Sequence, residues 1–344
     1  MKYRWLLTLF CFFSFSTYAQ DNILNVYIWS NEVPDSVIRQ FERETGIRVN
    51  YSTYDSNETL YAKLKANPKA GYDVIEPTNY FLQRMGREGM LQKLDKNKLP
   101  NYKNLDPQFL NTSFDPEGTY GIPYLWAVTG IFVNKNYYST NEAQSWESLW
   151  NSKFKNQILM LDDVREAFSI AFLTLGYSIN DSDPEHIHQA YLKLVKLLPN
   201  IKLFNNDAVP SIISDDDATI GLVWNGDFYK AAVENPAIEF IYPKEGFAIW
   251  VDCFAIPINA PNSENAYKFL NYMMRPDVAM QSMVEVKYAV ANTGARALLP
   301  SELRNNTKMY PLTDILKNGE FQSDITDEAL RLYQKYWELL KVQG

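Results

Sequence analysis

The chain has 344 residues, of which 46% are hydrophobic and 15% aromatic, so it is long enough for two lobes that each bury a core. Its formal net charge of −8 argues against nucleic-acid binding, because phosphate groups need a basic surface. Two histidines and two cysteines are too few to favour a structural zinc site. We expect neither a metal nor a cofactor.

The first residues have the pattern of a cleavable secretory signal peptide over residues 1–19. Two basic residues precede a short apolar run over residues 5–16, and Ala19 is a small residue suited to cleavage. The run is too short for a comfortable membrane span, and no other stretch of the sequence could span a membrane. We therefore expect a soluble protein exported to the periplasm, with Cys253 as its one thiol.

The segments that follow the leader alternate between strands and helices. They are, in order, a strand over 23–29, a helix over 34–46, a strand over 47–54, a helix over 58–66 and a strand over 72–76. Apolar residues recur at helical spacing in the first helix, and Gly46 is a natural stop at its C-terminus. This alternation predicts a mostly parallel sheet flanked by helices.

A second α/β region follows residues 121–123. Its strands are expected over 158–161, over 219–224 and from Ala255 onward, and its helices over 145–150, 185–197, 266–274 and 327–340. Asp183 is a plausible N-cap of the helix over 185–197, with Pro184 at its first position. Two α/β regions in one exported chain, with a helical tail, indicate a two-lobed binding protein with a hinged cleft.

Four aromatic or acidic clusters stand at the ends of apolar runs, where an open α/β sheet has its binding crevice. They are Ile28–Ser30, Leu161–Phe168, Leu222–Gly226 and Ile249–Asp252. Carboxylates hold ammonium groups, and aromatic faces cover the methylenes between them and attract cations. The combination suits a small, elongated organic cation.

Ten stretches, in order from about residue 25 to about residue 325, resemble the periplasmic spermidine/putrescine-binding proteins of bacterial ABC importers. Among them are NVYIWSNEVP, YSTYDSNETLYAKLK, LDDVREAF, VWNGDF and AIWVDCFAIP. The resemblance implies a type II periplasmic binding protein fold. In this fold each lobe is a mostly parallel sheet flanked by helices, and the ligand cleft lies between the lobes.

The resemblance also implies a domain division and a mechanism. It gives a first lobe of residues 22–125 with 253–298 and a second lobe of residues 126–252 with 299–344. A polyamine would bridge the lobes and favour hinge closure, and the closed protein would then dock on an inner-membrane permease. The expected hinge strands lie near 124–129 and 252–255. We expect a monomer whose mature chain neither inserts into the membrane nor binds nucleic acid.

The residues themselves give partial support to a ligand site. Trp250 and Asp252 are two apart on an expected strand, so their side chains share a face and Cys253 points to the other. Asp163 and Glu166 fit a helix N-cap and its N3 partner. By sequence alone the cap is the stronger interpretation, and the resemblance favours at least one of the two acids binding ligand.

Three positions depart from relatives with spermidine preference, and each adds a carboxylate. Glu32 stands where those relatives tend to carry Tyr, Asp227 where they tend to carry a small residue, and Glu76 replaces an apolar residue at a strand end. A solvated surface acid is the favoured interpretation of Glu76, less so of the other two. The polyamine class is therefore better supported than a preference for spermidine or putrescine.

The remaining candidates depend mainly on their match to cleft positions of the family. Arg165, between two acids, is interpreted as an exposed helix charge or as a group that orients a carboxylate. The complete set of expected ligand-binding residues is Trp29, Ser30, Glu32, Thr78, Tyr80, Asp163, Glu166, Trp224, Asp227, Trp250, Asp252, Tyr288 and Gln322.

Two other functions stay open on the sequence. A sugar or amino-acid carrier would share the aromatic platforms, but a sugar site favours neutral polar groups and an amino-acid site needs an arginine clamp. A hydrolase with paired carboxylates is disfavoured, because two acids at one helix start do not lie across a sugar ring. We therefore expect a carrier and not an enzyme.

Overall fold

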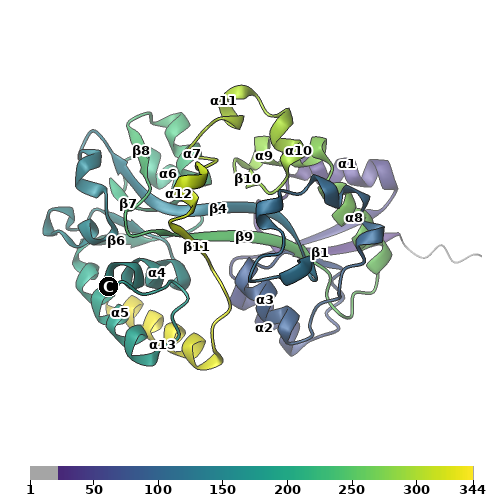
Figure 1. The fold of residues 1–344 in the computed structure, drawn as a ribbon, viewed down its shortest axis with the longest axis horizontal. Coiled ribbons are helices and arrows are strands. Elements are labelled where there is room, and N and C mark those ends of the chain that lie inside the picture. Colours follow the sequence, from purple (N-terminus) through teal and green to yellow (C-terminus); the bar gives the residue numbers. More distant parts are fainter. Residues whose placement is uncertain (1–21, 344) are drawn as a thin grey trace, which may run out of the picture.

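The computed structural model describes residues 22–343, so the expected signal peptide lies outside the described part of the chain. Figure 1 shows two lobes side by side, with two long strands running through the middle from one to the other. These strands are β4 (Gly121–Asn134) and β9 (Phe247–Ala255). They pair antiparallel with each other, with an irregularity between Pro123 and Leu125, and every residue in both is buried.

The first lobe begins with the predicted strand–helix alternation. Its elements are β1 (Ile23–Trp29), α1 (Asp35–Thr45), β2 (Arg48–Tyr54), α2 (Asn57–Ala66), β3 (Val74–Ile75) and α3 (Asn79–Arg87). β1 lies parallel to β2 on one side and to β3 on the other. The strand expected over 72–76 is shorter than predicted, because Pro77 has no backbone N–H with which to extend the ladder.

The chain returns to the first lobe after β9. The elements there are α8 (Ser263–Met273), α9 (Pro276–Val286), β10 (Ala289–Val290) and α10 (Thr293–Leu298). β10 pairs antiparallel with the first half of β4, and the last residue of β9 pairs with β3. The prediction of a strand that begins at Ala255 was wrong, because Ala255 ends β9 and Pro257 lacks a donor for a ladder.

The second lobe is built around the other half of β4. Its strands are β5 (Ile158–Met160), β6 (Ile201–Phe204), β7 (Ile220–Trp224) and β8 (Ile238–Ile241). Its helices are α4 (Val164–Leu175), α5 (Pro184–Leu197), α6 (Val209–Ser214), α7 (Asn225–Glu234) and α13 (Asp327–Gln343). β7 and β8 pair antiparallel with β4, and β5 lies parallel between β6 and β7.

Short helices fill many of the loops. The 3-10 helices are Lys96–Lys98, Pro100–Asn104, Pro107–Phe109, Pro116–Gly118, Thr140–Ala143, Trp146–Trp150, Ser152–Phe154 and Leu198–Asn200. The helix predicted over 145–150 is thus a single 3-10 segment, whose first backbone N–H is bonded to the carboxylate of Glu245. Throughout residues 22–343, every helix is too short or too polar to cross a membrane.

A last connection joins the lobes through α11 (Ser301–Arg304), α12 (Thr313–Leu316) and β11 (Gly319–Phe321), which lies parallel to β9. Beyond β11, the chain is held to the first lobe by Arg84 of α3. The buried Arg84 guanidinium donates to Asp324 at 2.9 Å and to the Ile325 carbonyl at 2.8 Å. Figure 1 shows this yellow segment running between the lobes toward α13. The residue bounds given for the lobes stay a prediction.

Candidate ligand-binding cleft

A cavity of about 210 Å³ lies between the lobes, lined by loops that follow their strands and by the middle of β9. All thirteen residues of the predicted site line this cavity: Trp29, Ser30, Glu32, Thr78, Tyr80, Asp163, Glu166, Trp224, Asp227, Trp250, Asp252, Tyr288 and Gln322. The structure therefore brings together residues that are far apart in the sequence. That they contact a ligand stays a prediction.

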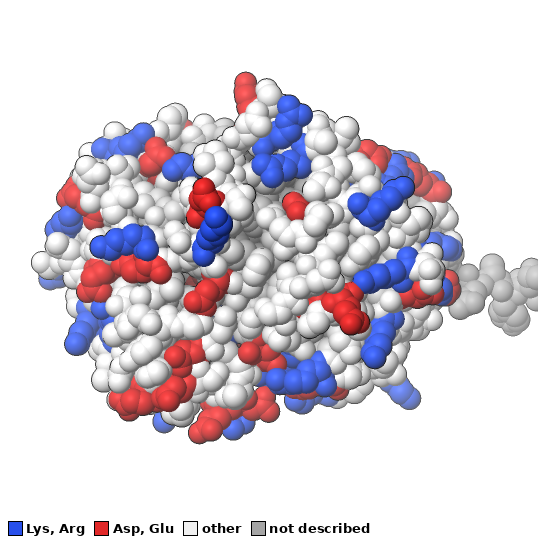
Figure 2. Space-filling model, in the orientation of Figure 1, with Lys and Arg blue, Asp and Glu red and all other residues white. Residues whose placement is uncertain are grey.

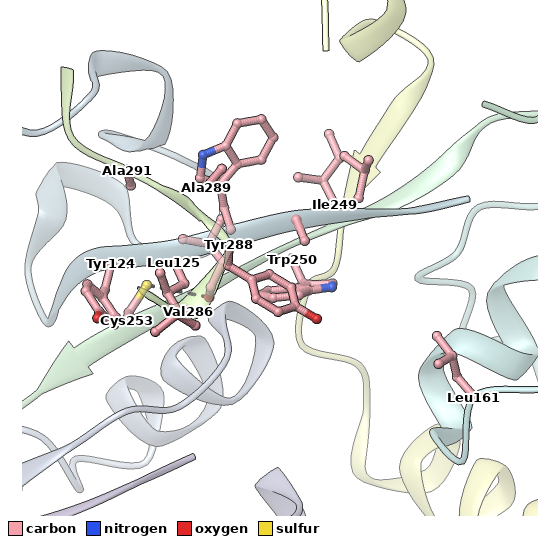
Figure 3. Packing of buried hydrophobic residues seen from close by; sticks show 14 of the residues in the cluster. Tyr124, Leu125, Leu161, Ile249, Trp250, Cys253, Val286, Tyr288, Ala289 and Ala291 are labelled. Carbon is pink, nitrogen blue, oxygen red and sulfur yellow. Dashed lines mark hydrogen bonds between the residues drawn. The ribbon is translucent and has the colours of Figure 1, made fainter. Parts of the chain in front are cut away.

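Aromatic rings form the middle of the cavity wall. The ring centroids of Trp224 and Trp250 are 5.9 Å apart and nearly perpendicular, and Trp250 lies 5.6 Å from Tyr288. Figure 3 shows Trp250 and Tyr288 together on one side of the crossing strands, with Leu161 near α4 well apart from them. Cys253 is buried, in agreement with its predicted position on the opposite face of the strand from Trp250 and Asp252. These faces suit the apolar part of an elongated ligand.

One end of the cavity is built on the N-terminus of α4. Asp163 Oδ1 accepts hydrogen bonds from the backbone N–H groups of Arg165 and Glu166, at 2.7 and 3.0 Å, so the predicted N-cap is present. Glu166 does not complete a capping box. Its Oε1 accepts instead from Gln322 at 3.2 Å and from Trp224 at 3.4 Å, which turns the carboxyl group toward the cavity.

Burial dominates the electrostatics of this end. It raises the pKa of Glu166 to about 8, with the neighbouring Asp163 as the next cause. Glu58, in the first turn of α2, was not predicted from the sequence, and burial together with Asp163 raises its pKa to about 7. A cation placed beside these carboxyl groups would lower their pKa values and favour their ionised form.

Arg165 is buried, with 1% of its surface exposed, so its interpretation as an exposed charge was wrong. Its guanidinium donates to Asn180 at 2.8 Å and to the Ser323 carbonyl at 3.2 Å. It also lies 4.9 Å from the centre of the Tyr80 ring. Because Tyr80 belongs to the first lobe, this cation–π contact crosses the cleft.

The other end of the cavity is centred on Asp252 in β9. Its Oδ1 accepts a hydrogen bond of 2.6 Å from the hydroxyl of Thr78. Thr78 stands at the N-cap of α3 but makes no cap bond with its side chain, and its hydroxyl accepts a bond from Asn57 at 2.9 Å. Burial raises the pKa of Asp252 to about 7.

Two further acids, Asp227 and Glu32, line the same cavity. Asp227, in the first turn of α7, forms an ion pair of 3.0 Å with Lys230. Burial raises the pKa of Asp227, and Lys230 opposes this rise. Glu32, in the loop after β1, has one buried carboxyl oxygen without a hydrogen-bond partner in the described residues. Burial raises its pKa well above the usual value, as do Asp252 and Glu76 to a smaller extent.

Glu76 is not the solvated surface acid that was favoured from the sequence. It is 0% exposed, and neither carboxyl oxygen has a hydrogen-bond partner among the described residues. It follows β3 and is not among the residues that line the cavity. Burial first and Asp252 second raise its pKa well above the usual value, and the backbone N–H of Trp29 opposes this rise. The packing of β3 against β9, through Ile75 and Ala255, brings the two acids together.

Comparison with known proteins identifies the family to which a chain with this cleft belongs. A family model for bacterial extracellular solute-binding proteins matches residues 36–311. The chain belongs to this family. A solute-binding protein is a carrier and not an enzyme, in agreement with the expectation from the sequence. Within residues 22–343, no group of three or more His, Cys, Asp or Glu side chains is placed to hold a metal ion.

Individual relatives of this solute-binding protein cover almost its whole length. It is 43% identical over 327 residues to the spermidine/putrescine-binding periplasmic protein of Escherichia coli K12, covering 95% of this chain and 94% of that one. It is 35% identical to the putrescine-binding periplasmic protein PotF of the same organism, covering 86% and 85%. Its fold matches the substrate-binding protein PotD of Streptococcus pneumoniae with a TM-score of 0.80 at 33% identity, covering 93% and 99%.

Sequence reasoning missed several residues of the cleft of this solute-binding protein. Lys230 lines the cavity, three residues after Asp227, and this spacing is a detectable signal for a helical ion pair. Asn57 and Tyr54 also line it, but nothing in their local sequence distinguishes them from core or surface residues. On the outer face drawn in Figure 2, acidic and basic side chains are interspersed, whereas acids predominate in the cleft.

Proposed function

We propose that this solute-binding protein captures linear polyamines, spermidine or putrescine, in the periplasm and delivers them to an ABC permease in the inner membrane. The observation that carries the proposal is the order of groups along the cavity. Glu166 contacts the indole of Trp224, and the ring of Trp224 lies 5.9 Å from that of Trp250. Asp252 stands two residues beyond Trp250 on β9, so carboxyl groups flank the two indole rings. The names of the relatives, which are spermidine/putrescine- and putrescine-binding proteins, support the same ligand class.

The chemistry of a polyamine matches this order. A hydrogen bond between a charged ammonium and a carboxylate contributes about 1.5–3 kcal/mol, and each buried methylene contributes about 0.8 kcal/mol. Two ammonium groups with the methylenes between them therefore suffice for micromolar binding, about −8 kcal/mol. A neutral sugar would leave buried carboxyl groups at both ends without compensation, which disfavours it.

The two ends of the cavity lie in different parts of the fold, which supports a closing mechanism. Asp163 and Glu166 begin α4 of the second lobe, whereas Asp252 is bonded to Thr78 of the first lobe. A ligand held at both ends bridges the lobes and stabilises the closed state, because it contacts both only there. We also propose that residues 1–19 are a signal peptide that directs export to the periplasm, and that the mature protein is a monomer.

Calorimetric titration of the mature protein with putrescine and spermidine tests the proposal, with glucose and glutamate as control solutes. We expect saturable binding of at least one polyamine, and a loss of at least about tenfold in affinity, about 1.4 kcal/mol, in Asp252→Asn. The matched control is Glu302→Gln, which removes an acid on the exposed surface of α11. Binding of a control solute without binding of either polyamine would contradict the proposal.

A further inference from the structure

Glu76 is a buried acid to which the proposed binding mode gives no role. It does not line the cavity, and both of its carboxyl oxygens lack hydrogen-bond partners among the described residues. Buried polar groups in proteins are nearly always hydrogen-bonded, and an ionised carboxylate without partners is strongly disfavoured in a protein interior. Burial therefore favours the protonated form of Glu76, and the backbone N–H of Trp29 opposes this effect only in part.

The groups that surround Glu76 offer it no positive charge. Asp252 of β9 is the charged side chain that acts on it most strongly. The titratable groups close enough to feel Glu76 when it is ionised are Tyr51 and Tyr54 of β2, Tyr124 of β4, Cys253 of β9 and Glu32 after β1. The one basic side chain among the described cavity-lining residues is Lys230, and it is paired with Asp227.

Asp252 is the link between Glu76 and the cavity. Its carboxyl group lines the cavity and is held by Thr78. The antiparallel pairing of Thr78 with Asp252 and of Ile75 with Ala255 places Glu76, two residues before Thr78, on the same face of the sheet as Asp252. When two carboxyl groups interact strongly, their protons belong to the pair and not to either residue. A positive charge placed at one member lowers the affinity of both members for protons.

We propose that Glu76 and Asp252 titrate as a coupled pair that holds a proton in the empty cavity, and that an ammonium group arriving at Asp252 displaces this proton. The proton leaves to solvent as the ligand's positive charge takes its place, so capture of the ligand is coupled to proton release. Glu76 is then a positioning residue that acts through Asp252 and makes the affinity for diamines depend on pH. This inference rests on the proposed polyamine function and adds a regulatory property to the same site.

The test is calorimetry with putrescine in pairs of buffers that differ in ionisation enthalpy, from about pH 6 to about pH 8, where alkylamines stay protonated. We expect the wild-type protein to release more protons per ligand than Glu76→Gln, by up to about one. Infrared difference spectra provide a second readout. The carbonyl stretch of a protonated carboxyl group is lost on putrescine addition to the wild type, and this loss is smaller in Glu76→Gln.

The control Glu302→Gln changes the net charge equally and should release as many protons as the wild type. If Glu76→Gln does not fold, Glu76→Leu removes the same ionisable group without burying a polar one. Equal proton release and equal infrared changes in the wild type and the Glu76 variant, with putrescine bound in both, overturn this inference alone. Failure of the wild type to bind any polyamine overturns it together with the proposed function.

Discussion

At the scale of single residues, the cleft is organised by acids that are kept from solvent. Burial raises the pKa of Glu166 to about 8 and that of Asp252 to about 7. Buried acids of this kind lower the folding stability of the empty protein relative to ordinary surface acids. A bound cation offsets this loss of stability. Perturbed carboxyl groups that converge on one cavity are typical of a functional site.

Glu166→Gln should weaken polyamine binding by at least about tenfold, about 1.4 kcal/mol. The amide preserves the shape of the side chain and can still accept from Gln322 and Trp224, but it cannot neutralise an ammonium group. The affinity is measured by titration calorimetry. Asp162→Asn is the matched control, because Asp162 pairs with Lys341 and does not line the cavity. An affinity equal to that of the wild type would remove Glu166 from the site.

Glu76→Gln should stabilise the empty protein, by about 1–3 kcal/mol at neutral pH. The sign follows from the raised pKa of Glu76: the folded state holds a proton that the unfolded state has lost, so wild-type stability falls as pH rises above the unfolded pKa. The gain should therefore grow from about pH 5 to about pH 8, in urea unfolding followed at several pH values. A gain that is absent or independent of pH would contradict the buried, protonated state.

Much of the candidate site could be predicted because the residue types that bind an organic cation follow strands in recognisable clusters. Glu76 and Arg165 could not, because their burial is decided by distant segments. Glu76 is covered where β3 meets β9, and Arg165 is covered by Tyr80, Asn180 and residues after β11. A local window around a charged residue contains none of these partners.

At the scale of elements, the segments with local signals were predicted well. Gly46 ends α1 in the left-handed conformation, with φ of 67°, and Asp183 caps α5 as expected. The errors lie at β3, at Ala255 and at residues 146–150, where proline or side-chain capping from another segment sets the boundary. The full length of β4 was not predicted either, because its partners in each lobe lie far along the chain.

The first turn of α7 packs closely against the ring of Tyr288 at Gly226, and this contact predicts the effect of a substitution in the helix. A Cβ at Gly226 would lie 2.5 Å from the Tyr288 ring, so Gly226→Ala should displace either the ring or the helix and weaken polyamine binding by about five- to tenfold, about 1 kcal/mol. Titration calorimetry measures the effect. Val233→Ala, on the exposed side of α7 at 67% exposure, should bind like the wild type. Unchanged affinity in Gly226→Ala would show that the ring can move freely.

At the scale of the whole molecule, strand–helix alternation in two regions was enough to predict a two-lobed α/β protein, whereas the type II fold and the residues assigned to each lobe depended on the family resemblance. The contacts between lobes join residues that sequence spacing does not relate. Arg165 over Tyr80 and Arg84 with Asp324 are examples. Their existence suggests that the described conformation is one in which the lobes are close together.

Small-angle scattering should show the corresponding change in shape. We expect the radius of gyration of the wild-type protein to fall when putrescine is added, because a ligand held at both ends favours the closed state. The variant Asp252→Asn should show a smaller change at the same ligand concentration. An unchanged radius in the wild type, under conditions where calorimetry shows saturation, would contradict closure by the ligand.

The pairing of β4 with β9 has a consequence for how ligands are distinguished. Two buried strands that are hydrogen-bonded along their crossing bend together more easily than they slide past one another, because sliding breaks every bond of the ladder. The proposed closure would then be a hinge motion, in which Asp252 lies near the hinge and the start of α4 moves with the second lobe. Under the proposed closing mechanism, the separation of charges in the ligand would set the angle between the two lobes. A ligand of the wrong length would be bound at one end only and would leave the lobes partly open. The protein would then distinguish ligands of different length by the conformation that each one stabilises.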